Sequence, residues 1–404
     1  MRICIVTIAG YVHGIGGMQR HTSDLARGLA AAGHDVEVIT TKHPEGIRVV
    51  EHEGVRWRFV EVLGNQVDRA WHRASHDEFV AAHRERPFDV IHSESTSALG
   101  LVRHNVHSTV PIVVKYHGNF IGLARANVRR AARGRTPRAI GREARSFAWL
   151  CGQHFPRGNW WRFHGFESMV PSRQQLDDQR RSHLIPRSKM HVVPNGVDAT
   201  LFRPRDRAAL RAELGLGSEH LLISVGRLTR EKGVHTAIQA LSLLDQPTRL
   251  AVVGDGEERE RLGQLARSLG VAERVDFLGR QPPEAVARYL AAADAFVFPT
   301  ERDEGAPLVL VEAMAAGLPV IATDMAQLSE VIDRPGENGL LVPLGDDDAL
   351  AAAASDLLED EERRHRIGAA ARERVLAEYT LDRMIDRTVA VYEIALGRER
   401  RTRP

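Results

Sequence analysis

Cysteine is scarce in this chain of 404 residues, which contains only Cys4 and Cys151. Two cysteines so far apart in sequence provide neither a disulfide framework nor the close spacing of a cysteine-based metal site. The fold therefore depends on neither a disulfide framework nor a cysteine-based metal site. Because disulfides are typical of oxidising compartments, the lack of a disulfide framework favours a cytoplasmic location.

Long apolar runs are also missing. No segment approaches the roughly 20 consecutive apolar residues that a membrane-spanning helix requires. Residues 2–9 are apolar, but glycines follow them where a signal peptide would carry its cleavage site, so the run predicts a first buried strand. With 43% hydrophobic and 27% charged residues, the composition is typical of a soluble globular protein that contacts a membrane at most peripherally.

Neither sign of charge dominates the whole chain, whose formal net charge is +2, but the distribution is uneven. Residues 120–190 contain 15 Arg or Lys against 4 Asp or Glu, and residues 120–165 hold three of the five tryptophans. This basic segment (residues 120–165) fits a solvated surface, a nucleic-acid patch, or a site where arginines meet anionic lipid or phosphate. No nucleic-acid-binding motif accompanies it, so we expect no nucleic-acid partner.

The length of the chain exceeds the size at which one hydrophobic core stops growing, which predicts two domains of about 200 residues each. Short apolar runs alternate with amphipathic stretches, a pattern that indicates parallel α/β sheets. The pattern restarts near residue 187, so we expect domains over 1–187 and 188–379. The expected strands cover residues 2–8, 35–40, 88–92, 111–115, 190–193, 220–225, 249–253, 274–278, 295–298 and 319–322.

The strongest chemical signal lies in residues 301–322, where Glu304 and Glu312 stand eight positions apart. Proline suits the first turn of a helix, so Pro307 predicts a helix from about 307 to 316. The exposed amides and positive dipole end of such a helix suit a diphosphate. Eight residues span roughly 12 Å along a helix, so the two carboxylates could bind the ribose and the hexose of one elongated ligand. The alternative is a pair of ordinary surface glutamates.

A second signal follows the expected strand 220–225, where Gly226-Arg227 and Lys232-Gly233 lie in one loop. Open α/β sheets bind ligands at the carboxyl ends of their strands. Arg227 and Lys232 could therefore neutralise two phosphates and stabilise a departing diphosphate. The alternative is solvated surface charge, but the nearby 301–322 pattern favours a phosphate site.

A glycine-rich loop, Gly14-Ile15-Gly16-Gly17, precedes a helix expected over 18–32, which ends before Gly33. It is not a dinucleotide fingerprint, because Gln19 occupies the last glycine position of G-x-G-x-x-G. The next strand also ends on Thr40 without the acidic residue that would bind a ribose. Both features argue against a dehydrogenase.

His117 follows the expected strand 111–115 and precedes Gly118. A lone histidine is more often structural than catalytic, but its place at a strand end favours a functional role. Asp346-Asp347-Asp348 invites a metal interpretation. Its position before an apolar run fits a helix N-cap with an acidic first turn better. We expect no metal and no cofactor.

Together these motifs resemble family 4 of the GT-B glycosyltransferases, over nearly the whole chain and most closely over 192–345. The family pattern of two glutamates separated by seven residues is matched by Glu304 and Glu312. Its Gly-Arg and Lys-Gly pairs are matched in the loop after strand 220–225. Where the family has Gly-Phe-Gly, this chain has Gly305-Ala306-Pro307.

The resemblance implies two Rossmann-like domains that face each other across a cleft, with the C-terminal segment 380–404 crossing back onto the first. It implies retaining, metal-independent transfer of a sugar from a nucleotide diphosphate-sugar to an acceptor hydroxyl. The acceptor would be a saccharide or a lipid-linked molecule. The reaction would belong to envelope polysaccharide or glycolipid assembly at the inner face of the membrane. In this view the basic segment contacts the acceptor or the membrane.

The resemblance also implies the roles of individual residues. Glu312 would bind the donor ribose, and His117 would face the donor sugar. The residues expected to act in catalysis are His117, Arg227, Lys232 and Glu304. The residues expected to contact the donor are Gly16, Gly17, Gly226, Arg227, Lys232, Glu304, Gly305, Ala306, Leu308, Val309 and Glu312.

Two other functions are compatible with the same fold. A nucleotide-sugar epimerase would share the fold but would need catalytic acids and bases around the sugar, whereas the 301–322 pattern resembles the transferase form. A non-catalytic sugar-nucleotide-binding protein would be expected to lack Arg227, Lys232 or Glu312, and all three are present.

Overall fold

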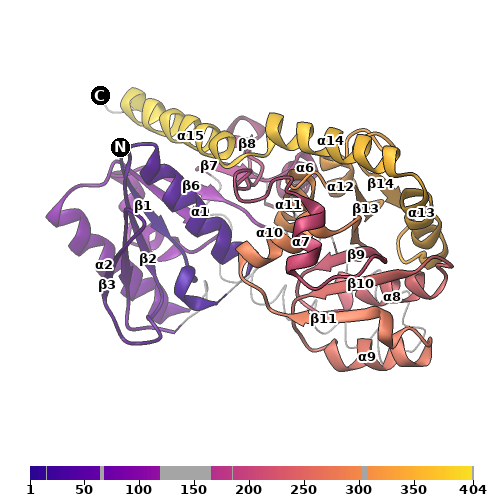
Figure 1. Cartoon of the computed structure of the whole chain (residues 1–404). Helices are drawn as coiled ribbons and strands as arrows, with labels where there is room; N and C mark the ends of the chain where they lie inside the picture. Colours follow the sequence, from indigo (N-terminus) through magenta and orange to yellow (C-terminus); the bar gives the residue numbers. More distant parts are fainter. Residues whose placement is uncertain (15, 64–67, 119–164, 184, 303–306, 403–404) are drawn as a thin grey trace, which may run out of the picture. The chain divides into compact units, whose positions relative to one another are not determined.

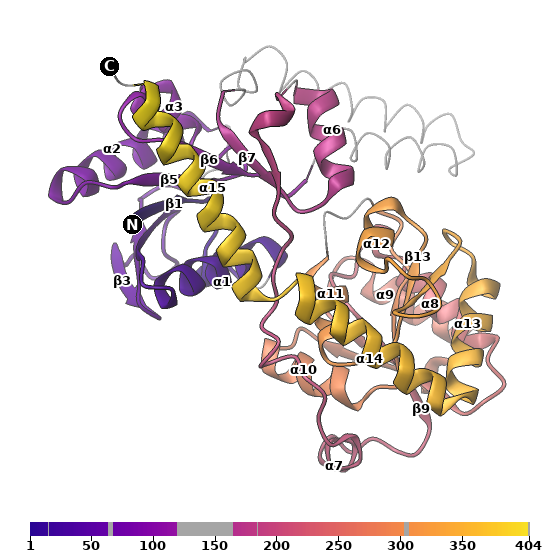
Figure 2. The same cartoon turned by 90° about the horizontal axis from the view of Figure 1, so that it is seen from above.

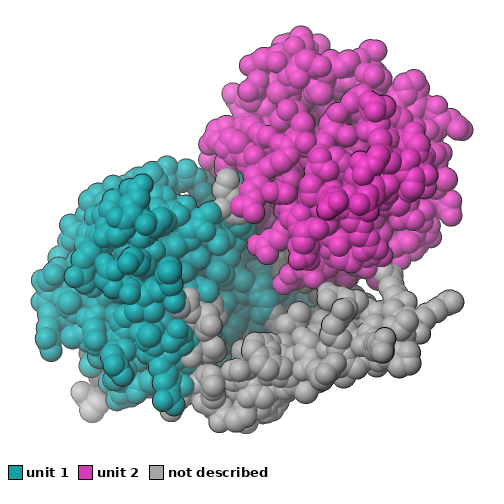
Figure 3. All heavy atoms as spheres, turned by 90° about the horizontal axis from the view of Figure 1, so that it is seen from below, with its two compact units in different colours: residues 1–195, 381–404 teal, residues 196–380 magenta. Residues whose placement is uncertain are grey.

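The computed structural model describes residues 1–14, 16–63, 68–118, 165–183, 185–302 and 307–402 (Figure 1). The chain divides into two compact units, coloured in Figure 3. The first unit contains residues 1–195 and 381–404, and the second contains residues 196–380. Except for Gly165, the basic segment lies outside the described residues, as do Glu304, Gly305 and Ala306. None of the helices in the described ranges is both long and apolar enough to span a bilayer.

The first unit is built on an eight-stranded sheet with the order β3-β4-β2-β1-β5-β6-β7-β8. All neighbours are parallel except β3 and β4, which form an antiparallel hairpin at the edge. The order reverses between β1 and β5, which makes the carboxyl ends of these two strands the expected ligand position. The strands are β1 (Arg2–Val6), β2 (Asp35–Thr40), β3 (Val49–His52), β4 (Val55–Phe59), β5 (Val90–Glu94), β6 (Ile112–Lys115), β7 (Glu167–Val170) and β8 (Met190–Val192).

Helices cover both faces of this sheet, and side chains of β1 alternate between them. Ile3 and Ile5 pack in one apolar cluster with α1 and α15, whereas Cys4 and Val6 belong to the cluster on the other face, which contains Trp71 of α2. The helices are α1 (Gly17–Ala31), α2 (Arg69–Glu85), α3 (Leu99–Arg103), α6 (Arg173–His183) and α15 (Leu381–Thr402).

The C-terminal helix α15 packs on the first unit, which confirms the expected return of the chain (Figure 2). It contacts α1 closely, because a Cβ atom at Gly28 would lie 2.8 Å from the side chain of Ile385. The C-terminal end of α1 also agrees with the prediction. Gly33 follows the helix with a φ of +84°, a conformation that glycine adopts without steric cost.

The second unit contains a parallel six-stranded sheet with the order β11-β10-β9-β12-β13-β14. The chain starts at the centre, runs outward through three strands, and returns to continue in the other direction from β12. This is the doubly wound order that binds ligands where it reverses, here between β9 and β12. The strands are β9 (His220–Val225), β10 (Thr248–Val253), β11 (Val275–Gly279), β12 (Ala295–Phe298), β13 (Val320–Thr323) and β14 (Leu340–Val342).

Apolar clusters lie on both faces of the second sheet, as the continuous hydrophobic strands require. The helices are α7 (Arg207–Glu213), α8 (Val234–Ser242), α9 (Arg259–Ser268), α10 (Pro283–Ala292), α11 (Leu308–Ala315), α12 (Ala326–Val331), α13 (Asp347–Glu359) and α14 (Glu361–Glu378). Asp346 caps α13 by accepting a hydrogen bond from the Ala349 amide at 2.9 Å. The N-cap interpretation of the aspartate run is therefore confirmed.

One expected strand belongs to the other sheet. Residues 190–193 were expected to open the second domain, but β8 pairs with β7 at the edge of the first sheet, where His191 lies opposite Met169. The boundary between the units falls after Asn195 instead of after 187. An apolar run predicts a strand, but its own residues do not show which sheet it joins.

Candidate functional site

The second unit carries its candidate site at the carboxyl ends of β9 and β12. Residues 226–233 follow β9 and are called the phosphate loop after the ligand that the sequence predicts for them, and residues 299–302 follow β12. Two glycines allow the backbone segments to approach closely. A Cβ atom at Gly233, which has a φ of +70°, would lie 1.8 Å from the carbonyl oxygen of Pro299, and one at Gly254 would lie 1.8 Å from that of Gly226.

Glu231 holds the phosphate loop against the segment after β12. Its carbonyl accepts hydrogen bonds from the Glu301 amide at 2.8 Å and from the Thr300 hydroxyl at 3.2 Å. Its carboxylate accepts a hydrogen bond from Arg302 at 2.8 Å. The structure therefore brings together the two segments in which the sequence placed the donor site, up to the last described residue before 303–306.

The two cations of the phosphate loop have different surroundings. The ammonium group of Lys232 lies 5.7 Å from the ring centroid of Phe298, the last residue of β12, within the range of a cation–π contact. Arg227 is exposed to solvent. Lys232 is thus held at the point where the strand order reverses, and Arg227 is accessible beside it in the same loop.

Helix α11 begins one residue later than predicted and ends one residue earlier, since Pro307 is its N-cap residue. Leu308 and Val309 are half-buried in its first turn. The side chain of Glu312 is 1% exposed. The alternative of an ordinary surface glutamate is therefore wrong for Glu312.

In the first unit, Gly16 is the N-cap of α1 with an extended backbone, and its carbonyl accepts a hydrogen bond from the Arg20 amide at 3.0 Å. A Cβ atom at Gly17 would meet nothing within 4 Å among the described atoms. The space beside the start of α1 is therefore open on the side of Gly17. Since α1 follows β1, this helix start lies at the reversal of the first sheet.

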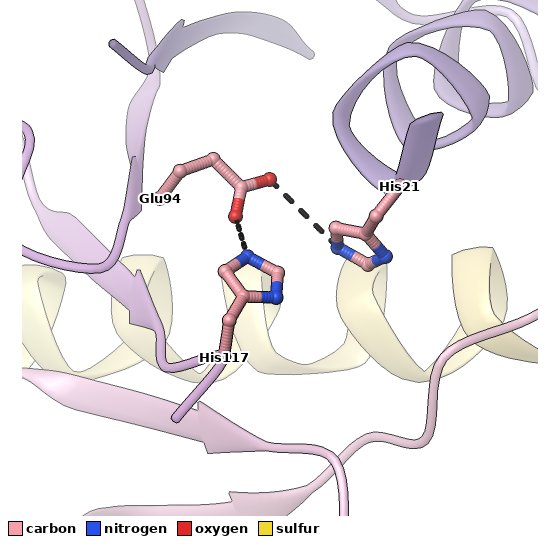
Figure 4. Close-up of side chains that lie close together, drawn as sticks. All are labelled: His21, Glu94 and His117. Carbon is pink, nitrogen blue, oxygen red and sulfur yellow. Dashed lines mark hydrogen bonds and ion pairs between the residues drawn. The ribbon is translucent and has the colours of Figure 1, made fainter. Parts of the chain in front are cut away.

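A buried cluster at that reversal combines His21 of α1, Glu94 at the end of β5 and His117 just after β6 (Figure 4). One carboxylate oxygen of Glu94 contacts Nε2 of His117, and the other lies 3.8 Å from Nε2 of His21. The two rings stand edge to face with centroids 4.7 Å apart. The buried cluster (His21, Glu94 and His117) forms because the carboxyl ends of β5 and β6 are adjacent in the sheet.

Helix α6 fixes the backbone after β6. The side chain of Gln179 donates a hydrogen bond to the Gly118 carbonyl at 2.9 Å, and that of Gln175 donates one to the His117 carbonyl at 3.5 Å. The second ring nitrogen of His117 points away from Glu94 (Figure 4). The His117 side chain is 16% exposed, so this edge of the ring can meet a ligand.

Burial and charge set the protonation of the cluster. Burial alone would raise the pKa of Glu94, but the electrostatic effect of His117 and its hydrogen bond hold that pKa well below its usual range. Burial keeps the pKa of His21 well below 6.5 despite the carboxylate beside it. Burial also lowers the pKa of Lys115 to about 7, an effect that Glu94 partly offsets. The cluster therefore contains an ionised Glu94 next to a neutral His21.

These three residues are also the one group among the described residues whose ligand atoms lie close enough to hold a metal ion, all within 4.8 Å of one another. Two histidines and a carboxylate would suit a transition metal. However, His117 and Glu94 contact each other directly. This contact favours an ion pair between protein side chains over a metal site.

Sequence reasoning identified His117 but missed Glu94 and His21. The expected strand 88–92 ended too early, whereas β5 runs to Glu94. A usable signal was present, because His92 and Glu94 are polar residues at alternate positions of a strand that is buried throughout. Polar groups in such a strand need partners, so they indicate a buried polar network.

Two family models match this chain, and together they cover most of it. The model described as Glycosyltransferase Family 4 matches residues 15–201. The model described as Glycosyl transferases group 1 matches residues 206–374. The two matches meet close to the boundary between the two units.

Among curated proteins, the chain is 34% identical over 210 residues to an N-acetyl-alpha-D-glucosaminyl L-malate synthase of Bacillus anthracis. This match covers 51% of the chain and 54% of the relative. The chain is also 39% identical over 193 residues to a D-inositol 3-phosphate glycosyltransferase of Nocardia farcinica. That match covers 45% of the chain and 42% of the relative. The chain thus spans about half the length of these relatives.

Among solved structures, a sucrose-phosphate synthase from Thermosynechococcus elongatus is similar over the whole chain. The superposition has a TM-score of 0.78 with 25% sequence identity. It covers 98% of this chain and 100% of the other. The similarity confirms the expected fold class.

Proposed function

The chain belongs to the group 1, family 4 glycosyltransferases of GT-B fold, and on that premise we propose that it transfers a sugar from a nucleotide diphosphate-sugar to an acceptor hydroxyl, with retention of anomeric configuration. One observation carries the proposal. The phosphate loop and residues 299–302 lie together at the reversal of the second sheet, joined through Glu231. This is the position where doubly wound sheets bind nucleotides.

The donor diphosphate is the natural ligand of this position. Arg227 and Lys232 stabilise the negative charge that develops on the departing diphosphate. The amides at the start of α11, from Leu308 and Val309, add donors at the positive end of the helix. By family resemblance, Glu312 binds the ribose and Glu304 contacts the sugar or phosphate side of the donor, which Gly305 and Ala306 also contact.

The first unit supplies the groups that act on the sugar and the acceptor. By family resemblance, His117 faces the donor sugar with the ring edge that points away from Glu94. Gly17 leaves room at the start of α1, directly after the N-cap residue Gly16. The bond between the anomeric carbon and the diphosphate breaks, and the acceptor oxygen bonds to that carbon on the same face. The acceptor proton leaves on the nucleoside diphosphate. The loop cations balance its charge, so the mechanism requires no metal.

An anionic acceptor fits the charge of the chain. The relatives above are named for L-malate and D-inositol 3-phosphate, both anions at neutral pH. The basic segment has the complementary charge, with arginines in large excess over acidic residues. We place the reaction in envelope polysaccharide or glycolipid assembly, with a saccharide or lipid-linked acceptor at the inner face of the membrane.

The proposal is tested with a panel of nucleotide sugars in the presence and absence of EDTA. Thermal stabilisation of the protein and release of nucleoside diphosphate are measured for wild type, Arg227→Ala and Glu312→Ala. Arg230→Ala is the matched control, because Arg230 is an exposed arginine of the same loop outside the family motif. One donor should stabilise wild type and the control with or without EDTA, and should fail to stabilise the other two variants.

Three results would overturn the proposal. Equal stabilisation of all variants would place the donor elsewhere. Stabilisation that disappears in EDTA would require a metal. Conversion of one nucleotide sugar into another without release of nucleoside diphosphate would identify an epimerase.

A further inference from the structure

A buried polar chain connects the C-terminal helix to His117. The Tyr392 hydroxyl of α15 lies 2.6 Å from Nδ1 of His92 in β5, although the two residues are 300 positions apart in sequence. Nε2 of His92 lies 3.5 Å from Glu94, which contacts His117 through its other oxygen. Tyr392, His92 and Glu94 are each 0% exposed.

The burial of Tyr392 helps to determine which atoms donate and which accept in this series of contacts. Burial, with a smaller effect of Glu94, keeps the pKa of the Tyr392 hydroxyl well above its usual value, so it retains its proton. Within the described ranges, the partner recorded for this hydroxyl is Nδ1 of His92. An ionised carboxylate can only accept, and Glu94 faces Nε2 of His92, so the His92 proton resides on Nε2 and Nδ1 accepts from the Tyr392 hydroxyl.

Glu94 is consequently approached by a ring N–H on each oxygen. His92 approaches Oε1, and His117 contacts Oε2. The other ionisable groups near the carboxylate are the neutral His21 from α1 and Lys115 from β6. A carboxylate held from one side presents a fixed oxygen to the ring on its other side, which fixes the orientation of that ring.

Packing alone does not explain the hydroxyl of Tyr392. Its ring lies in an apolar cluster with Ile385 and Val391 of α15 and with Val113 of β6. A phenylalanine would fill the same space without placing a polar atom in it. A buried hydroxyl lowers stability unless it is hydrogen-bonded, so its contact with His92 is what makes tyrosine suitable here.

We propose that Tyr392 and His92 are positioning residues for glycosyl transfer, which hold Glu94 so that His117 presents its free ring edge to the donor sugar. The inference rests on the proposed function. It adds that the C-terminal helix reaches the reaction through a chain of buried polar contacts. Neither Tyr392 nor His92 touches the substrate.

The test compares Tyr392→Phe with Tyr379→Phe. Tyr379 is the matched control, because it is buried and its hydroxyl donates to the Glu330 carbonyl at 3.2 Å in the second unit. Tyr392→Phe should leave the donor KM unchanged and lower kcat about tenfold, as is usual when an orienting hydrogen bond is lost. Tyr379→Phe should change neither quantity.

A second measurement separates this inference from the proposed function. Diethyl pyrocarbonate modifies accessible imidazoles, and mass spectrometry follows its reaction with His117 without any donor. His117 should react faster in Tyr392→Phe than in wild type or Tyr379→Phe, because its ring is held less firmly. If the wild type transfers no sugar but this difference appears, the proposed function fails and the positioning chain stands. Equal modification rates in all three proteins, or an unchanged kcat in Tyr392→Phe, would overturn the inference.

Discussion

The two sheets reverse their strand order in the same way but place opposite kinds of chemistry at the reversal. In the first unit the position is occupied by the buried cluster, in which Glu94 is fully enclosed. In the second unit it is occupied by the phosphate loop, with an exposed Arg227 and closely packed glycines. A group that must hold one orientation is best buried and paired, whereas a group that receives a diphosphate must stay accessible. The same position in the fold can thus serve either to orient a side chain or to bind a ligand.

The largest effect should come from the phosphate loop. Lys232→Ala removes the ammonium group held over Phe298 and with it stabilisation of the departing diphosphate. We expect kcat/KM to fall about thousandfold, the usual loss when a donor to developing charge is removed. Release of nucleoside diphosphate measures this fall, and Arg230→Ala should remain close to wild type. A loss below tenfold in Lys232→Ala would mean that the loop binds no phosphate.

The buried cluster should affect turnover more than binding. Glu94→Gln keeps the shape of the side chain but removes the charge that pairs with His117, so we expect kcat to fall about a hundredfold with little change in the donor KM. The control is Glu167→Gln, which alters another buried glutamate that pairs with a histidine, His191 at 2.8 Å, away from the reversal. An equal loss of kcat in both variants would show that the effect is structural.

Close packing of the phosphate loop should contribute to the free energy of unfolding. Gly233→Ala introduces a Cβ atom at a positive φ and against the Pro299 carbonyl. We expect the free energy of unfolding to fall by about 2–3 kcal/mol, measured by urea denaturation. Gly17→Ala is the control, since its added methyl group meets no described atom. An equal loss of unfolding free energy in both variants would contradict the close approach of the phosphate loop to the Pro299 carbonyl.

The smallest effect concerns Lys115 and the pH dependence of stability. Burial lowers its pKa in the folded protein to about 7 from 10.5. Between these values the unfolded chain binds a proton that the folded protein does not. Stability should therefore rise with pH across this window, by at most about 1.4 kcal/mol per pH unit. Lys115→Met should show a flatter dependence in urea denaturation at pH 7, 8 and 9. Parallel curves for the two proteins would contradict the burial of a neutral lysine.

The sequence predicted regular elements better than contacts between distant residues. The expected strands 35–40, 220–225 and 295–298 coincide with β2, β9 and β12, because each is rich in Val, Ile, Leu or Phe and has clear ends. The hairpin of β3 and β4 was missed, because β3 has little apolar burial to reveal it.

The candidate site was predictable only where one segment carries the chemistry. Glycine and charge spacing identified the phosphate loop, since its residues are neighbours in the chain. The buried cluster joins residues from α1, β5 and β6, and Tyr392 reaches it from α15. No local pattern shows which strand ends meet, because the order of strands in the sheet decides it.

The central claim is that the phosphate loop of the second unit binds the diphosphate of a nucleotide. Titration calorimetry with UDP, GDP and ADP in the presence of EDTA tests it most directly. The account predicts that wild type and Arg230→Ala bind one of these nucleotides with the same affinity, and that Lys232→Ala binds it about tenfold to a hundredfold more weakly. Equal affinity in wild type and Lys232→Ala, or no binding of any nucleoside diphosphate to wild type, would contradict it.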